Sequence, residues 1–216
     1  MLSELAEIIW VSLKVSGLSV IIAGALALPT AVALLVYRFP GRRGLIVVNQ
    51  TLMAAPTVVI GLLLYLLLSR SGPLGSLGLL YTPAAIVVGQ AVLVLPIITG
   101  FSYSALQQVD SRARLTAVRL GASQMQAGWL VIREARLALV MAVLAAFARA
   151  ISEIGIAMML GGNIRHATRT MTTAIALESH KGDFTASIIL GCVLLAITLG
   201  INLAVFSFTG SQEPDE

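Results

Sequence analysis

The chain has 216 residues, of which 58% are hydrophobic and 11% are charged, with a formal net charge of +4 and a mean hydropathy of +0.96. Soluble domains carry about 25% charged residues, so this composition excludes an ordinary soluble domain and predicts a multi-spanning membrane protein. The single cysteine, Cys192, excludes an intrachain disulfide and argues against a cysteine-ligated metal cluster.

Five apolar stretches are long enough to cross a bilayer, which takes about 20 residues. They cover residues 8–37, 45–68, 83–105, 137–160 and 185–208. Pro29, Pro56 and Pro96 fall inside the first three, and we expect each of them to kink its helix. Thr82 before Pro83 predicts a helix N-cap followed by proline at the first helical position. The sequence therefore predicts an all-α integral membrane protein with about five transmembrane helices.

The lysines and arginines between these stretches predict the orientation. One set of connections contains Arg38, Arg42 and Arg43, together with five arginines between residues 110 and 136. The other set contains Lys14, Arg70, Arg165, Arg169 and Lys181. Because eight basic residues stand against five, we expect the N-terminus to lie outside and the C-terminus in the cytoplasm. Residues 209–216 would then form a short polar cytoplasmic tail.

Residues 110–136, the basic segment, interrupt the apolar sequence between the third and fourth spans. Residues 115–120 are predicted to be helical, Gly121 to break the helix, and Ser123 to cap a second helix over about 124–132. One interpretation is a loop held against anionic lipid headgroups. The other is a docking element for a soluble protein, because the turn Gly121-Ala122-Ser123 permits a close backbone approach.

The spacing of Ala117, Gly121 and Val131 resembles the cytoplasmic EAA loop of ABC importer permeases. In that pattern, three residues separate Glu-Ala-Ala from a glycine, and nine residues separate that glycine from an aliphatic residue. The chain departs from the pattern at residues 115 and 116, where Leu and Thr replace Glu and Ala, and at 133–134, where Arg-Glu replaces Leu-Pro.

The second half of the chain strengthens this resemblance. Residues 147–155, 158–163, 168–178 and 182–184 look like the oxyanion-importer permeases, most of all the tungstate type, with the molybdate type close behind. The resemblance covers residues 6–208, which would form one type I ABC transporter transmembrane domain in the plasma membrane of a bacterium or archaeon.

This resemblance implies a homodimer around a central pathway. Each copy would dock on one of two cytoplasmic ATPase subunits through about residues 111–131, with Ala117, Gly121, Ala122, Ser123 and Val131 in the coupling region. A binding protein outside the membrane would deliver the anion, which is tungstate or alternatively molybdate or sulfate. No cofactor and no nucleic-acid partner is expected.

The chain itself lacks the means to hydrolyse ATP through a P-loop. That motif requires lysine directly after glycine, but the only lysines, Lys14 and Lys181, follow leucine and histidine. The energy for active transport would come from a partner or an ion gradient. The proton relay of a self-contained secondary transporter needs ionisable groups at mid-span positions, and only Arg149 and Glu153 stand at such positions. No metal-ligand spacing or nucleophile–base arrangement predicts a membrane enzyme.

Arg149 and Glu153 lie four residues apart within the fourth expected span. Either charge alone in hydrocarbon costs at least about 2.5–3.5 kcal/mol, so we expect them to pair on one helix face. That face would form a ridge with Ala145 and Ala157, beside a second alanine ridge that favours close helix packing. The pair is either a structural element or part of a pathway or gate that also includes Gly155 and Asn163.

The connection over residues 161–184 is expected on the outer side. Arg165, Arg169, Thr172 and Thr173 carry guanidinium and hydroxyl groups that suit a tetrahedral oxyanion, and they are candidates for an outer mouth. The alternative is a solvated loop that contacts the binding protein. Apolar residues between 171 and 177 predict a short amphipathic helix within it.

Overall fold

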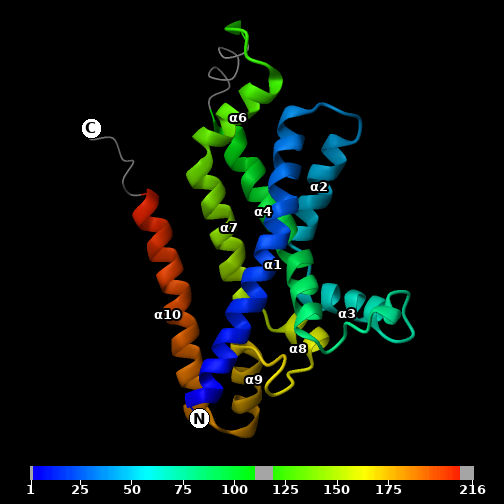
Figure 1. Ribbon diagram of the computed structural model, residues 1–216, viewed down its shortest axis with the longest axis vertical. Helices are drawn as coiled ribbons and strands as arrows, with labels where there is room; N and C mark the ends of the chain where they lie inside the picture. Colours follow the sequence, from blue (N-terminus) through cyan, green and yellow to red (C-terminus); the bar gives the residue numbers. More distant parts are fainter. Residues whose placement is uncertain (1, 110–118, 210–216) are drawn as a thin grey trace.

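The computed structural model describes residues 2–109 and 119–209, and these residues form helices and turns with no strand among them (Figure 1). Three helices are long and apolar enough to cross a membrane, namely α1 (Leu2–Val36), α4 (Pro83–Gln108) and α10 (Phe184–Thr209). The others are α2 (Arg42–Met53), α3 (Thr57–Leu68), the 3-10 helix η1 (Gly75–Leu77), α6 (Gln124–Glu134), α7 (Arg136–Ile151), α8 (Gly155–Gly161) and α9 (Met171–Lys181). The predicted all-α class is confirmed for the described residues.

The second expected span consists of two helices, α2 and α3, bent by 102°. The N–H groups of Ala54 and Ala55 donate to the carbonyls of Thr51 and Leu52, three residues earlier, and these bonds tighten the end of α2. Pro56 follows with an extended backbone and becomes the N-cap of α3. Since proline has no N–H to continue the ladder, the break falls where it stands. Figure 1 shows α3 projecting sideways from the long helices.

The fourth expected span is also divided, into α7 and α8, which are bent by 60°. The number of spans is therefore three, or up to five if each bent pair counts as one. The prediction of one ridge through Ala145, Arg149, Glu153 and Ala157 is wrong, because α7 ends at Ile151 and Glu153 lies in the break. The neighbouring alanine face is buried as expected at residues 142, 146 and 150.

Small side chains let α1 and α4 pack closely against α7 and α8. Ala23, Ala27 and Ala31 of α1 are fully buried. On α4, a Cβ added to Gly89 would lie 2.5 Å from both Ile156 and Leu160, so α8 occupies the space that a side chain would need. The absence of large side chains at these positions allows backbones to approach within van der Waals contact.

The two ends of the molecule differ in what they carry. The α1–α2 connection and α6 lie at one end, whereas α9 and the start of α1 lie at the other (Figure 1). Arg38, Arg42 and Arg43 thus share an end with the described part of the basic segment, as the charge pattern predicts. Which end faces the cytoplasm stays a prediction. Helix α10 runs beside the other helices from the α9 end and is exposed over most of its surface.

Candidate functional site

The turn before α6 places a small exposed tip at one end of the molecule. Gly121 has φ +94°, a left-handed conformation that L side chains rarely adopt, and a Cβ there would meet nothing within 4 Å. Ala122 is half-buried, and Leu120 is 82% exposed. The predicted helix break at Gly121 is confirmed. Ala117 and residues 110–118 as a whole lie outside the described residues.

Ser123 begins α6 with a reciprocal capping box. Its hydroxyl accepts a hydrogen bond from the N–H of Gln126 at 3.2 Å, and the Gln126 side chain accepts from the N–H of Ser123 at 2.8 Å. These two bonds satisfy donors that a helix start otherwise leaves open, which confirms the predicted cap. They also fix the direction in which α6 leaves the turn.

The far end of α6 is anchored in the protein core. Val131 is 3% exposed and belongs to a buried cluster with Ala31 of α1, Leu106 of α4 and Ala135. Ala135 is at once the C-cap of α6 and the N-cap of α7. The tip at Gly121 and the membrane helix α7 are therefore joined through one short helix with a buried anchor.

Arg149 and Glu153 form the predicted pair across the end of α7. Arg149 Nη1 donates to Glu153 Oε2 at 2.7 Å, with the side chains 38% and 4% exposed respectively. The second carboxylate oxygen, Oε1, accepts from the N–H of Gly155 at 2.9 Å and of Ile156 at 3.3 Å. One buried carboxylate thus neutralises the arginine of α7 and caps the first turn of α8.

The same break is tied to α9. The Thr172 hydroxyl donates to the carbonyl of Glu153 at 2.9 Å. Asn163 Nδ2 donates to the carbonyl of Thr173 at 3.4 Å, and Asn163 itself has φ +52°. A Cβ on Gly155 would lie 3.2 Å from Glu153 Oε1, so glycine gives the carboxylate room there. Four of the predicted residues, Glu153, Gly155, Asn163 and Thr172, therefore meet around the α7–α8 break and the start of α9.

The predicted outer-mouth residues divide into exposed and buried groups. Arg165 donates two bonds of 2.8 Å to the two carboxylate oxygens of Glu4, and this hydrogen bonding raises the pKa of Arg165. Arg169 Nε donates to Asn163 Oδ1 at 3.2 Å. Thr172 and Thr173 are 4% and 0% exposed, and Thr173 completes a capping box with Thr170 at the start of α9. The predicted helix in this connection is confirmed as α9.

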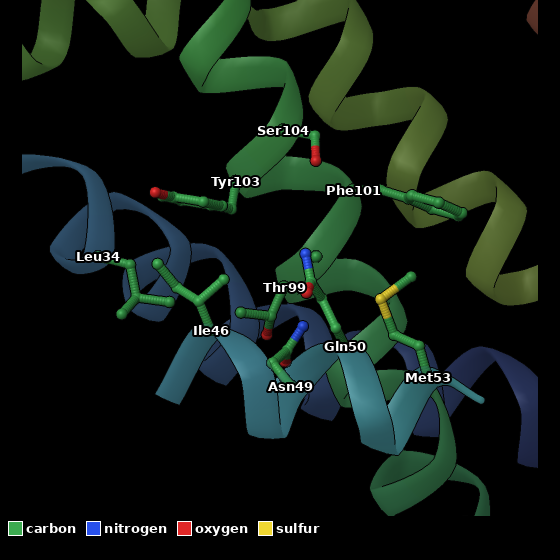
Figure 2. A pocket seen from close by; sticks show the side chains of 10 residues that line it. Leu34, Ile46, Asn49, Gln50, Met53, Thr99, Phe101, Tyr103 and Ser104 are labelled. Carbon is green, nitrogen blue, oxygen red and sulfur yellow. The ribbon is translucent and has the colours of Figure 1, made fainter. Parts of the chain in front are cut away.

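Sequence reasoning missed a cavity between α1, α2 and α4, whose lining combines apolar side chains with several polar ones. It measures about 190 Å³, and its lining includes Asn49, Gln50, Thr99, Tyr103 and Ser104 (Figure 2). Asn49 donates to the carbonyl of Pro96 at 3.0 Å. The signal in the sequence was a pair of amide side chains, Asn49 and Gln50, inside an otherwise apolar stretch. Within the described residues no group of His, Cys, Asp and Glu is arranged to hold a metal ion.

Comparison of the sequence with known proteins identifies the family. Residues 17–215 match the family described as the binding-protein-dependent transport system inner membrane component. The chain is 44% identical over 206 residues to a probable anion ABC transporter permease protein of Haloferax volcanii, covering 93% of this chain and 89% of that one.

Two further relatives are both described as the tungstate uptake system permease protein TupB. The chain is 40% identical over 204 residues to the tungstate uptake system permease protein TupB of Peptoclostridium acidaminophilum, covering 94% of this chain and 90% of that one. It is 38% identical over 166 residues to the TupB protein of Campylobacter jejuni, covering 77% and 70% of the two chains. With apolar helices throughout and a family match across nearly its whole length, the chain belongs to the family of inner membrane components of binding-protein-dependent transport systems, the ABC transporter permeases.

Proposed function

We propose that this chain is the transmembrane permease subunit of an ATP-driven importer for a tetrahedral oxyanion, with tungstate as the substrate. The observation that carries the proposal is the similarity to two tungstate uptake permeases at 40% and 38% identity, one of them over 94% of the chain. Molybdate and sulfate are the alternative substrates of the same class, because the three anions share charge and tetrahedral shape.

The proposal assigns α6 and the turn before it to coupling with a separate ATPase subunit. Support comes from an exposed tip at Gly121 and Ala122, a rigid cap at Ser123, and an anchor at Val131 that leads directly into α7. A displacement of the tip would be transmitted to the membrane helices, because only Ala135 stands between α6 and α7. Ala117 belongs to the same proposed region on the strength of the sequence pattern alone.

The proposal assigns gating to the α7–α8 break. Arg149, Glu153 and Gly155 stand there, and Thr172 links the break to α9. Asn163, beyond the other end of α8, joins the same proposed gate through its bond to the carbonyl of Thr173 in α9. Arg165 would face the outer binding protein or its anion, since its side chain is 60% exposed, and Arg169, 15% exposed, lies behind it on the same carboxylate of Glu4. Two copies of the chain would enclose the pathway between them.

Replacement of Gly121 by tryptophan tests the coupling assignment. The left-handed backbone and the new bulk at the tip should abolish co-purification with a co-expressed ATPase subunit. Gly182→Trp is the matched control, because Gly182 has φ +82° and equally open surroundings but is the C-cap of α9, a helix at the other end of the molecule. An intact complex with Gly121→Trp would refute the assignment.

Uptake into vesicles tests the transport proposal itself. Vesicles that contain the permease, its ATPase and ATP should accumulate labelled tungstate supplied on its binding protein, and unlabelled molybdate or sulfate should compete weakly. Equal uptake without ATP would instead indicate a secondary transporter. Stronger uptake of molybdate or sulfate would reassign the substrate but keep the class.

A further inference from the structure

A cup lined by three arginines lies at the connection between α1 and α2. Arg38, Phe39, Gly41, Arg42 and Arg43 line this basic cup, which has a volume of about 670 Å³. The ion pairs among the described residues all lie elsewhere, so no described carboxylate within 4.0 Å neutralises these arginines. Three arginines around one cavity, none of them paired with a described carboxylate, favour an anionic ligand.

Arg42 is held in position by neutral groups. Its Nε donates to the carbonyl of Leu34 at 2.5 Å, and Nη2 donates to the Tyr103 hydroxyl at 2.9 Å. These bonds use two of the five N–H donors of a guanidinium, and no counterion for it stands among residues 2–109 and 119–209. Arg38 and Arg43 are exposed on either side of it in the sequence. The cup therefore combines one fixed arginine with two that are free to close on a ligand.

An apolar groove begins one residue before the cup. This aromatic groove has a volume of about 550 Å³ and is lined at and just beyond the end of α1 by Val32, Val36 and Tyr37. Its lining from α6 is Gln126, Gly128, Trp129 and Ile132. Tyr37 and Trp129 are 63% and 67% exposed. Tyrosine and tryptophan in such positions are typical of the interface between lipid headgroups and hydrocarbon.

We propose that the basic cup and the aromatic groove together bind one anionic phospholipid, with its phosphate among the three arginines and an acyl chain in the groove. The juxtaposition of an unneutralised cationic cavity with an apolar groove suits a molecule that is anionic at one end and aliphatic at the other. This site is separate from the proposed oxyanion pathway, and its test measures lipid rather than transport.

The experiment measures binding of phosphatidylglycerol to the purified, delipidated full-length protein by native mass spectrometry. Each arginine near an anionic headgroup is worth about 1 kcal/mol, or roughly fivefold in affinity. Arg38→Gln with Arg43→Gln should therefore weaken binding by roughly 25-fold, while phosphatidylcholine binds weakly to all variants. Arg70→Gln, an arginine outside the cup, is the matched control and should leave binding unchanged.

Gly128→Leu tests the groove while leaving the charges in place. A Cβ on Gly128 would stand 3.6 Å from Val36 Cγ2, an ordinary contact, so Gly128→Ala should bind lipid as the wild type does. The longer leucine side chain should fill the groove and weaken phosphatidylglycerol binding several-fold, with no change in oligomeric state. The size-exclusion profile of each variant reports whether it is folded.

Several results would overturn the proposal. Equal affinity for phosphatidylglycerol and phosphatidylcholine would remove the charge argument, as would unchanged binding in the double arginine variant. Inorganic phosphate that competes as effectively as the lipid would reassign the cup to a free anion. Loss of a dimer with Gly128→Leu, at unchanged lipid binding, would show that a second copy of the chain occupies the groove.

Discussion

Replacement of Glu153 should expose its double role at the α7–α8 break. Glu153→Ala removes the ion pair with Arg149 and leaves the N–H groups of Gly155 and Ile156 without their acceptor. Loss of a helix cap costs about 1 kcal/mol. Loss of a buried pair costs about 3–5 kcal/mol, which we reduce to about 1–3 kcal/mol because the Arg149 side chain is 38% exposed. The expected loss is therefore about 2–4 kcal/mol.

Glu153→Gln separates the two contributions. The amide oxygen still accepts from the N–H groups at the start of α8, whereas the charge that pairs with Arg149 is gone. The Gln variant should therefore be about 1 kcal/mol more stable than the Ala variant, which corresponds to about 2–4 °C in Tm for a chain of this size.

Thermal unfolding in detergent, followed by size-exclusion chromatography of heated samples, measures both changes. Glu178→Gln serves as a control, because Glu178 pairs with exposed Lys181 at 2.9 Å and an exposed pair contributes about 0–1 kcal/mol. A Gln variant as unstable as the Ala variant would refute the capping role. Wild-type stability in the Ala variant would refute both roles.

Further substitutions at Gly89, Gln90 and Glu4 test helix packing, a buried pair of hydrogen bonds and an exposed ion pair. Gly89→Ala should cost about 1–3 kcal/mol through overpacking against Ile156, whereas Gly17→Ala, which meets nothing within 4 Å, should leave Tm unchanged or raise it. The Gln90 side chain bridges α1 and α7, because it accepts from the Ser19 hydroxyl at 3.2 Å and donates to the Ala150 carbonyl at 3.0 Å. Gln90→Leu should therefore lower the stability by about 1–2 kcal/mol. Gln90→Glu should lower it further in the same thermal assay. Glu4→Gln should change stability by less than about 1 kcal/mol despite its bidentate bond to an arginine, because the pair is exposed; a loss of several kcal/mol would contradict this.

Local signals predicted the helix starts well. Thr82 accepts a hydrogen bond from the N–H of Ala85 at 3.4 Å, with Pro83 at the first helical turn, and Ser123 forms its predicted cap. Capping is decided within four residues, so the sequence carries it completely. Pro29 and Pro96 lie inside α1 and α4, which continue as helices past them, and the kinks expected at these two residues stay predictions.

The break at residues 152–154 was not predicted because no proline marks it. Ser152-Glu153-Ile154 is compatible with a helix, and what ends α7 is the use of the Glu153 carboxylate as a cap for α8. The break is further stabilised by a residue distant in the sequence, because the Thr172 hydroxyl donates to the Glu153 carbonyl. The pairing of Arg165 with Glu4 is likewise a contact between residues 161 positions apart. No local pattern encodes such contacts, so the candidate site was predicted residue by residue but not as an assembly.

The exposure of α10 has a consequence for biogenesis. This helix contacts mainly α9 and α7, and large side chains such as Leu195, Leu199 and Leu203 are more than half exposed. Because α10 follows α1, α4, α7 and α8 in the chain, most of the packing among those helices is available before α10 is made. Insertion of α10 therefore adds a helix whose exposed apolar surface must be covered by lipid or by another chain.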